Sequence, residues 1–90
     1  MFYTEDNVRV LKILTLEGKD FRNKDGYSIY GILKTSIRIG SKMKIWNGTM
    51  GKDLETSPII NTTKTEDGRL FVETEDSLFL VERYSPYFNR

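Results

Sequence analysis

Carboxylates are the side chains in this sequence whose spacing comes nearest to acid–base chemistry. Glu73 and Glu75 are two positions apart, and Glu66 is followed directly by Asp67. Residues two apart on a strand share one face, whereas a glycosidase needs two carboxyls ~5–10 Å apart across a cleft. Nothing in the sequence suggests such a cleft, so we expect both pairs to lie on solvated surface.

Histidine and cysteine are absent from the 90 residues. Their absence excludes Ser-His and Cys-His catalysis, disulfides, and zinc sites built from thiolates or imidazoles. Asp67 and Asp76 offer oxygen ligands, but no EF-hand spacing surrounds them. We therefore expect a protein that is not an enzyme and has no catalytic residue, metal or cofactor.

A glycine-containing stretch, Gly48-Thr-Met-Gly51-Lys52, lies near the middle of the chain. It has neither the G-x-x-x-x-G-K-[ST] spacing of a phosphate loop nor a following helix that would aim backbone N–H groups at a phosphate. The stretch is not a phosphate loop. A basic loop that touches an anionic ligand remains open as an alternative.

Cations are concentrated just before and within this stretch. Residues 34–52 contain five cations and no acid, whereas residues 53–82 contain eight acids and two cations. A stripe of cations ending in an aromatic ring is typical of single-stranded nucleic-acid binding. The neighbouring acids and the net charge of only +1 weigh against it. Binding of single-stranded nucleic acid or a nucleotide-type anion is our alternative function, and it would use Arg38, Lys42, Lys44 and Lys52.

Aromatic residues favour a protein partner instead. The only tryptophan is Trp46, and the last seven residues contain Tyr84, Tyr87 and Phe88. Tryptophan, tyrosine and arginine are the commonest anchors of protein interfaces. We predict partner binding through these four aromatic residues, and we also expect a homo-oligomer, because a small core gains stability from association.

Short strands must position these side chains. Valine, isoleucine, threonine and aromatic residues are frequent and alanine is absent, which favours strands over long helices. We expect strands over 8–16, where a helix from a Thr4 or Asp6 cap is the rival interpretation, and over 27–35 with Gly31 at a bulge or barrel bend. Asp25-Gly26 is the expected turn between them.

The stretch from Ile37 to Trp46 alternates in an informative way. If it is extended, the odd-numbered apolar residues face inward and the even-numbered set forms a stripe that ends in Trp46. Gly40-Ser41 could divide it in two. The inward set is Ile37, Ile39, Met43 and Ile45, and the outward set is Arg38, Lys42, Lys44 and Trp46.

The second half of the chain predicts a three-strand meander. Asn47-Gly48 has the signature of a type I′ hairpin turn, and residues 49–55 are expected to form an irregular loop. Ser57-Pro58 should begin a strand, because proline cannot donate to a ladder. The expected strands are 59–65, 69–75 and 78–83, with turns at Asp67-Gly68 and Asp76-Ser77.

Two resemblances accompany these patterns. Residues 31–45 resemble the strand, glycine turn, strand sequence of translation-factor and SH3-like barrels. Leu54-Glu-Thr-Ser-Pro-Ile59, together with Thr74-Glu-Asp-Ser-Leu-Phe79, is similar to short proteins of unassigned function that tailed phages encode. This second resemblance implies a compact phage product, and it brings no activity or site residue with it.

We therefore expect one all-β domain over residues 1–90, with 84–90 as an aromatic tail. The fold should be a small antiparallel barrel or rolled sheet of about six short strands. The expected function is that of a phage-type accessory or inhibitor that occludes a protein partner. The sequence has neither a signal peptide nor an apolar run of ~20 residues, so we expect a cytoplasmic protein, in the host if phage-encoded, without a membrane partner.

Overall fold

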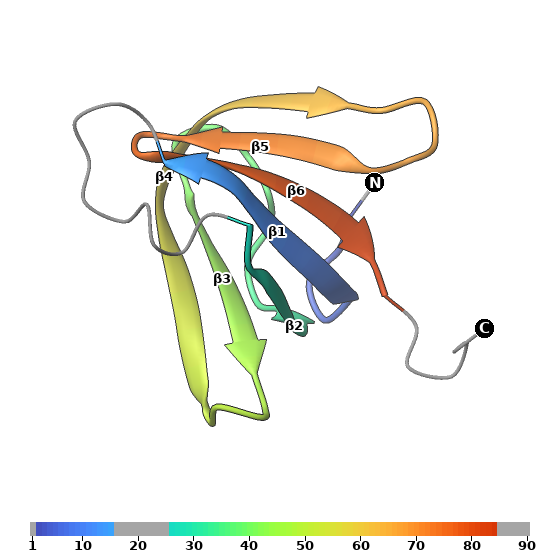
Figure 1. Ribbon diagram of the computed structural model, residues 1–90, viewed down its shortest axis with the longest axis vertical. Coiled ribbons are helices and arrows are strands. Elements are labelled where there is room, and N and C mark those ends of the chain that lie inside the picture. Colours follow the sequence, from blue (N-terminus) through green and yellow to red (C-terminus); the bar gives the residue numbers. More distant parts are fainter. Residues whose placement is uncertain (1, 16–25, 85–90) are drawn as a thin grey trace.

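The computed structural model describes residues 2–15 and 26–84 of the chain (Figure 1). Each strand pairs antiparallel with the next one, and the last pairs with the first to close a barrel. The all-β class and the small antiparallel barrel are confirmed, as is the C-terminal meander. The strands are β1 (Asn7–Thr15), β2 (Ser28–Leu33), β3 (Lys42–Asn47), β4 (Lys52–Lys64), β5 (Leu70–Thr74) and β6 (Ser77–Arg83).

β1 is a strand rather than the rival helix. Val8 and Val10 point into the barrel and are buried, whereas Arg9 between them points outward and is half-buried. β1 lies between β2 and β6 and pairs with both. A central strand with β-branched residues on its inner face satisfies both backbone hydrogen bonding and burial, which a helix at this position would not do.

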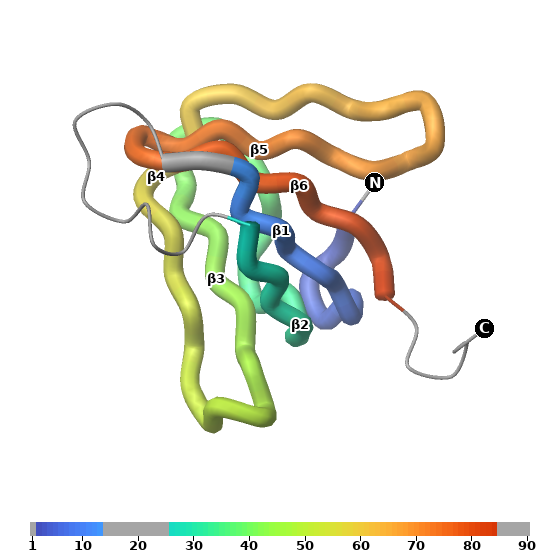
Figure 2. Tube along the Cα trace, in the orientation of Figure 1, coloured from blue at the N-terminus to red at the C-terminus, as the bar shows by residue number. Residues whose placement is uncertain are grey.

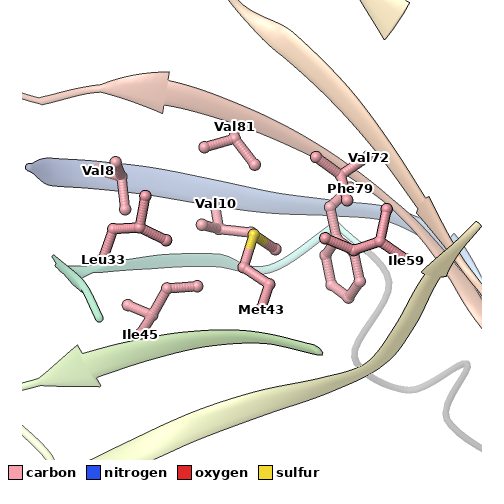
Figure 3. Close-up of a cluster of buried hydrophobic side chains, with 9 residues drawn as sticks. All are labelled: Val8, Val10, Leu33, Met43, Ile45, Ile59, Val72, Phe79 and Val81. Carbon is pink, nitrogen blue, oxygen red and sulfur yellow. The ribbon is translucent and has the colours of Figure 1, made fainter. Parts of the chain in front are cut away.

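The core consists of inward-pointing side chains from all six strands (Figure 3). Burying each of the larger ones stabilises the fold by ~1.5–3 kcal/mol relative to leaving it exposed. The alternation predicted over 42–46 is confirmed, since Met43 and Ile45 are buried there. The core residues are Val8, Val10, Leu33, Met43, Ile45, Ile59, Val72, Phe79 and Val81.

The prediction of one extended row over 37–46 is wrong in its first half. Residues 34–41 form no strand, and Ile39 is 64% exposed instead of buried. Gly40 has φ +92°, and its N–H donates to the carbonyl of Ile59, while the Ile59 N–H donates to the carbonyl of Ser41. The chain therefore turns at Gly40 immediately before β3, and Ile39 and Arg38 lie outside the strand.

The prediction that a strand begins at Ser57-Pro58 is wrong, because β4 runs through both residues. The strand begins at Lys52, so residues 52–55 are not a loop, and it continues through Pro58 to Lys64. Its first part pairs with β3 and its second part with β5, so the hairpins at its two ends point in different directions (Figures 1 and 2). The register shifts next to Pro58, and the Thr56 hydroxyl accepts the N–H of Met43 at 3.0 Å. Proline fits because the ladder is already interrupted at this bulge.

The β3–β4 hairpin is also wider than predicted. Asn47 pairs with Lys52, which leaves a four-residue loop, and the positive φ belongs to Gly51 rather than to Asn47 or Gly48. The side-chain oxygen of Asn47 accepts the N–H of Met50 at 3.0 Å, and its carbonyl accepts the N–H of Gly51. These two bonds favour the longer loop over a type I′ turn.

The β5–β6 turn consists of Glu75 and Asp76, one residue earlier than expected. Thr74 is fully buried, and its hydroxyl accepts the N–H of Ser77 at 3.1 Å. This bond fixes the start of β6 at Ser77. Glu73 faces outward on β5 and Glu75 lies in the turn, so the two carboxylates do not line a cleft together.

The β4–β5 turn at Asp67-Gly68 is confirmed, and Gly68 has φ +87°. The Thr65 hydroxyl donates to the Asp67 carboxylate, and the Arg69 guanidinium donates to the same group at 3.0 Å. These hydrogen bonds lower the pKa of Asp67 from 3.8 to about 2, the bond from Thr65 having the largest effect.

The lowered pKa of Asp67 predicts how the stability of the fold changes at acid pH. Because the folded pKa of Asp67 is below its ordinary value, its stabilising contribution is present above pH ~4 and is lost as the pH falls towards 2. An NMR titration of the Asp67 carboxyl should show a midpoint of about 2. Thr65→Val should move that midpoint upward. A wild-type midpoint at the ordinary value of 3.8 would contradict the geometry of this turn.

Candidate functional site

Trp46 lies on the outside of the barrel because of the alternation in β3. Its neighbours Ile45 and Asn47 point inward and are buried, so Trp46 points outward and is 37% exposed. The register places it directly opposite Ile32 of β2. Side chains opposite each other on one face of a sheet are in contact range, so Trp46 and Ile32 are neighbours on the outer face.

Two tyrosines continue this surface. Tyr30 lies two residues before Ile32 and therefore shares its face, and it is 48% exposed. Its ring meets that of Tyr84 edge-on, with centroids 4.8 Å apart and an interplanar angle of 62°. The N–H of Tyr84 donates to the carbonyl of Asn7 at 2.9 Å, which holds the chain beside β1 after β6 ends. We call Ile32, Tyr30, Trp46 and Tyr84 the aromatic face.

An ion pair fixes the surface next to the aromatic face. Arg9 of β1 lies opposite Tyr30 on one side and Glu82 on the other. Its guanidinium donates to Glu82 at 3.0 Å and to the Ser28 hydroxyl at 3.2 Å. A guanidinium bonded on both sides has few remaining rotamers, so this part of the surface is ordered before any partner binds.

The structure places two of the predicted partner-binding residues on the same outer face of the barrel. Trp46 and Tyr84 are far apart in sequence, and Ile32 and Tyr30 connect them across β2. Tyr87 and Phe88 lie outside the described residues. The sequence prediction missed Tyr30 and Ile32, although their spacing of two was a usable signal that they share one face.

The predicted anion-binding cations do not converge. Lys42 and Lys44 point outward from β3, and Arg38 is exposed on the segment before it. Lys52 is paired with the inward-pointing Asn47, so it lies on the opposite side of the β3–β4 hairpin.

Acids also flank the outward cations. Glu55 is directly opposite Lys44, and Asp53 is directly opposite Trp46. Cations and acids on neighbouring strands thus face each other, and acids at these positions would repel a polyanion. Within residues 2–15 and 26–84, no group of three or more acidic side chains is arranged to hold a metal ion. The same residues form no helix that could cross a membrane.

Comparison of the chain with protein-family models, with curated proteins and with solved structures finds no match. The aromatic face is therefore the feature from which we infer a function.

Proposed function

We propose that this chain is a non-enzymatic binding protein whose aromatic face docks on a partner protein. The observation that carries the proposal is the continuity of four outward aromatic and aliphatic side chains across β3, β2 and the residue after β6. Contiguous exposed apolar surface on a small domain is characteristic of interaction sites. Rigid aromatic rings bind with a small loss of conformational entropy, and they are enriched at interface centres.

The biological setting that fits is a phage-type accessory or inhibitor acting in the host cytoplasm. Its support is the similarity of the 54–59 and 74–79 stretches to short phage proteins. Occlusion is the mechanism that such a small domain offers, because it needs binding area and no reaction centre. The aromatic face would cover a functional surface of the partner, and the charged residues around it would set the orientation.

Alanine substitution at the aromatic face tests this proposal. Trp46→Ala and Tyr84→Ala should each weaken partner binding at least about tenfold, because buried aromatic anchors usually account for much of an interface's free energy. Both residues are partly exposed in the barrel, so circular dichroism should remain that of the folded protein. Isolation of bound proteins from the native source, followed by affinity measurement with the purified partner, provides the readout.

Ile60→Ala is the matched control, because Ile60 is 47% exposed on β4 and does not belong to the aromatic face. It should bind the partner as the wild type does. Equal retention of the same partner by all four proteins would refute the role of the aromatic face. Sedimentation of the purified chain tests self-association: a dimer that dissociates in Trp46→Ala would identify the partner as a second copy.

A further inference from the structure

β2 has two edges, and the hydrogen bonds to β1 show which residues face each edge. Lys12 donates its N–H to the carbonyl of Tyr27, and Leu33 donates its N–H to the carbonyl of Asp6. Along an antiparallel strand, successive residues direct their N–H and C=O groups to alternate edges. The odd-numbered residues of β2 therefore bond to β1, and Ser28, Tyr30 and Ile32 direct their backbone groups to the other edge.

β3 covers only the last part of that second edge. The β2–β3 registers are Ile32 with Trp46 and Leu33 with Ile45, and the N–H of Lys34 extends the ladder to the carbonyl of Lys44. No described strand is in register with Ser28 or Tyr30 on this side. Within residues 2–15 and 26–84, two sets of donor and acceptor groups thus have no strand partner along this edge, at the spacing of alternate strand residues, about 6.6–6.8 Å.

A groove of about 640 Å³ lies beside this part of β2. Ser28 and Ile29 line one side, Asn47 and Leu54 of the β3–β4 hairpin line the other, and core residues including Phe79 form part of its apolar lining. Figure 2 shows the β3–β4 hairpin extending away from the rest of the barrel. The groove therefore combines a strand edge with an apolar lining.

Charges around the groove do not select an ion. Two cations and two acids line it, so an ion of either sign meets charges of both signs; these residues are Lys12, Lys52, Glu55 and Asp76. The edge of β2 instead presents backbone N–H and C=O groups at a regular spacing. Another extended backbone is the chemical group that complements them.

We propose that an extended segment of the partner protein adds to β2 as a strand within this groove. Its backbone would exchange hydrogen bonds with Ser28 and Tyr30, and its alternate side chains would contact the apolar lining around Phe79. This inference rests on the proposed function, because the side chain of Tyr30 belongs to the aromatic face while its backbone lies on the same β2 edge as Ser28, which lines the groove. One partner protein would thus contact both the aromatic face and the groove beside β2.

Amide hydrogen exchange of the full chain tests the edge directly. In the free monomer, the amides of Ser28 and Tyr30 should exchange much faster than those of Ile29 and Gly31, which are paired with β1. Nine-residue peptides selected from a displayed random library on the immobilised chain then serve as the probe. A bound peptide should slow exchange at Ser28 and Tyr30 at least tenfold and leave the other two amides unchanged. Slow exchange at both residues in the free monomer, or peptide binding without slowing, would overturn the proposal.

Proline substitution provides a second, independent test. Ser28→Pro removes an N–H that points to the groove, and it leaves the hydrogen bonds to β1 intact because those use odd-numbered residues. Ser28→Ala is the matched control, since it loses the same hydroxyl but keeps the N–H. The peptides should bind at least tenfold more weakly to Ser28→Pro than to Ser28→Ala, and equal affinity would count against strand addition. If Ser28→Pro fails to fold, the amide exchange of the wild type with and without peptide decides whether a strand adds to β2.

The two proposals can fail separately. Partner binding that is lost in Trp46→Ala but unchanged in Ser28→Pro would leave the aromatic face as the docking surface and refute strand addition. Partner binding that is unchanged in Trp46→Ala and Tyr84→Ala would refute the proposed function, whatever the peptides do.

Discussion

Gly31→Ala is expected to destabilise the barrel by about 3 kcal/mol, at the upper end of the usual range for overpacking. A methyl group on Gly31 would lie 2.5 Å from Cγ2 of Ile45 and closer still to the carbonyl oxygen of Trp46. The carbonyl belongs to the backbone of β3, so a side-chain rotation cannot relieve the clash. The two strands would have to separate at the point where β2 and β3 are held by few hydrogen bonds. Urea unfolding followed by tryptophan fluorescence measures the loss.

Gly48→Ala is the matched control for Gly31→Ala. Its added methyl group would be no closer than 3.7 Å to Trp46, and Gly48 is not among the glycines with positive φ. The free energy of unfolding should therefore change by less than about 0.5 kcal/mol. A similar loss in both variants would show that the close approach of β2 and β3 is not what requires glycine at position 31.

Met43→Ala should lower the free energy of unfolding by about 2–5 kcal/mol. Met43 is fully buried, and its side chain lies among those of neighbouring core residues (Figure 3). Truncation removes apolar contacts and leaves a cavity that a closed sheet cannot easily collapse to fill. A domain of this size has a total stability of only about 5–15 kcal/mol, so the variant should be partly unfolded in mild denaturant.

Met50→Ala is the matched control, because it truncates a methionine that is not buried. Met50 is 56% exposed in the loop of the β3–β4 hairpin, so its truncation should change the unfolding free energy by less than about 0.5 kcal/mol. Thermal and urea unfolding of both variants provide the comparison. If Met43→Ala were as stable as Met50→Ala, position 43 would not belong to the core.

Much of the fold was predictable because its strands obey local rules. The alternation of Val8 and Val10 around Arg9, and that of Met43 and Ile45 around Lys44, identifies strands with one buried face. Gly31 was expected at a bulge or barrel bend, and it lies where β3 approaches too closely for a side chain. Side-chain burial of this kind is encoded within a few neighbouring residues.

The predictions that are wrong concern positions whose structure depends on hydrogen bonds to residues far away in the sequence. The strand through Pro58 depends on a bulge in which the Thr56 hydroxyl accepts the N–H of Met43. The exposure of Ile39 depends on the turn at Gly40, which is hydrogen-bonded to a residue of β4. The sequence contains these residues, but their pairing across the barrel is a tertiary property that no local pattern specifies.

The candidate site was only partly predictable for the same reason. Residue type identified Trp46 and Tyr84 as anchors, but the face that each one occupies depends on registers among β1, β2, β3 and β6. The spacing of two places Tyr30 on one face with Ile32, but no local pattern shows that this face meets Trp46 and Tyr84. The groove beside β2 was also unpredictable, because it results from the β3 pairing that ends at Ile32.

The pairing of β1 with β6 has a consequence for how the barrel forms. Val8 is in register with Arg83, so closure joins segments near opposite ends of the described chain. Contacts at such separation are entropically costly and make folding slow compared with that of helical domains of equal size. Until they form, β1 and β6 each expose an unpaired edge, which is a template for intermolecular association. Slow closure therefore defines a time window in which concentrated refolding solutions aggregate, and refolding yield should rise on dilution.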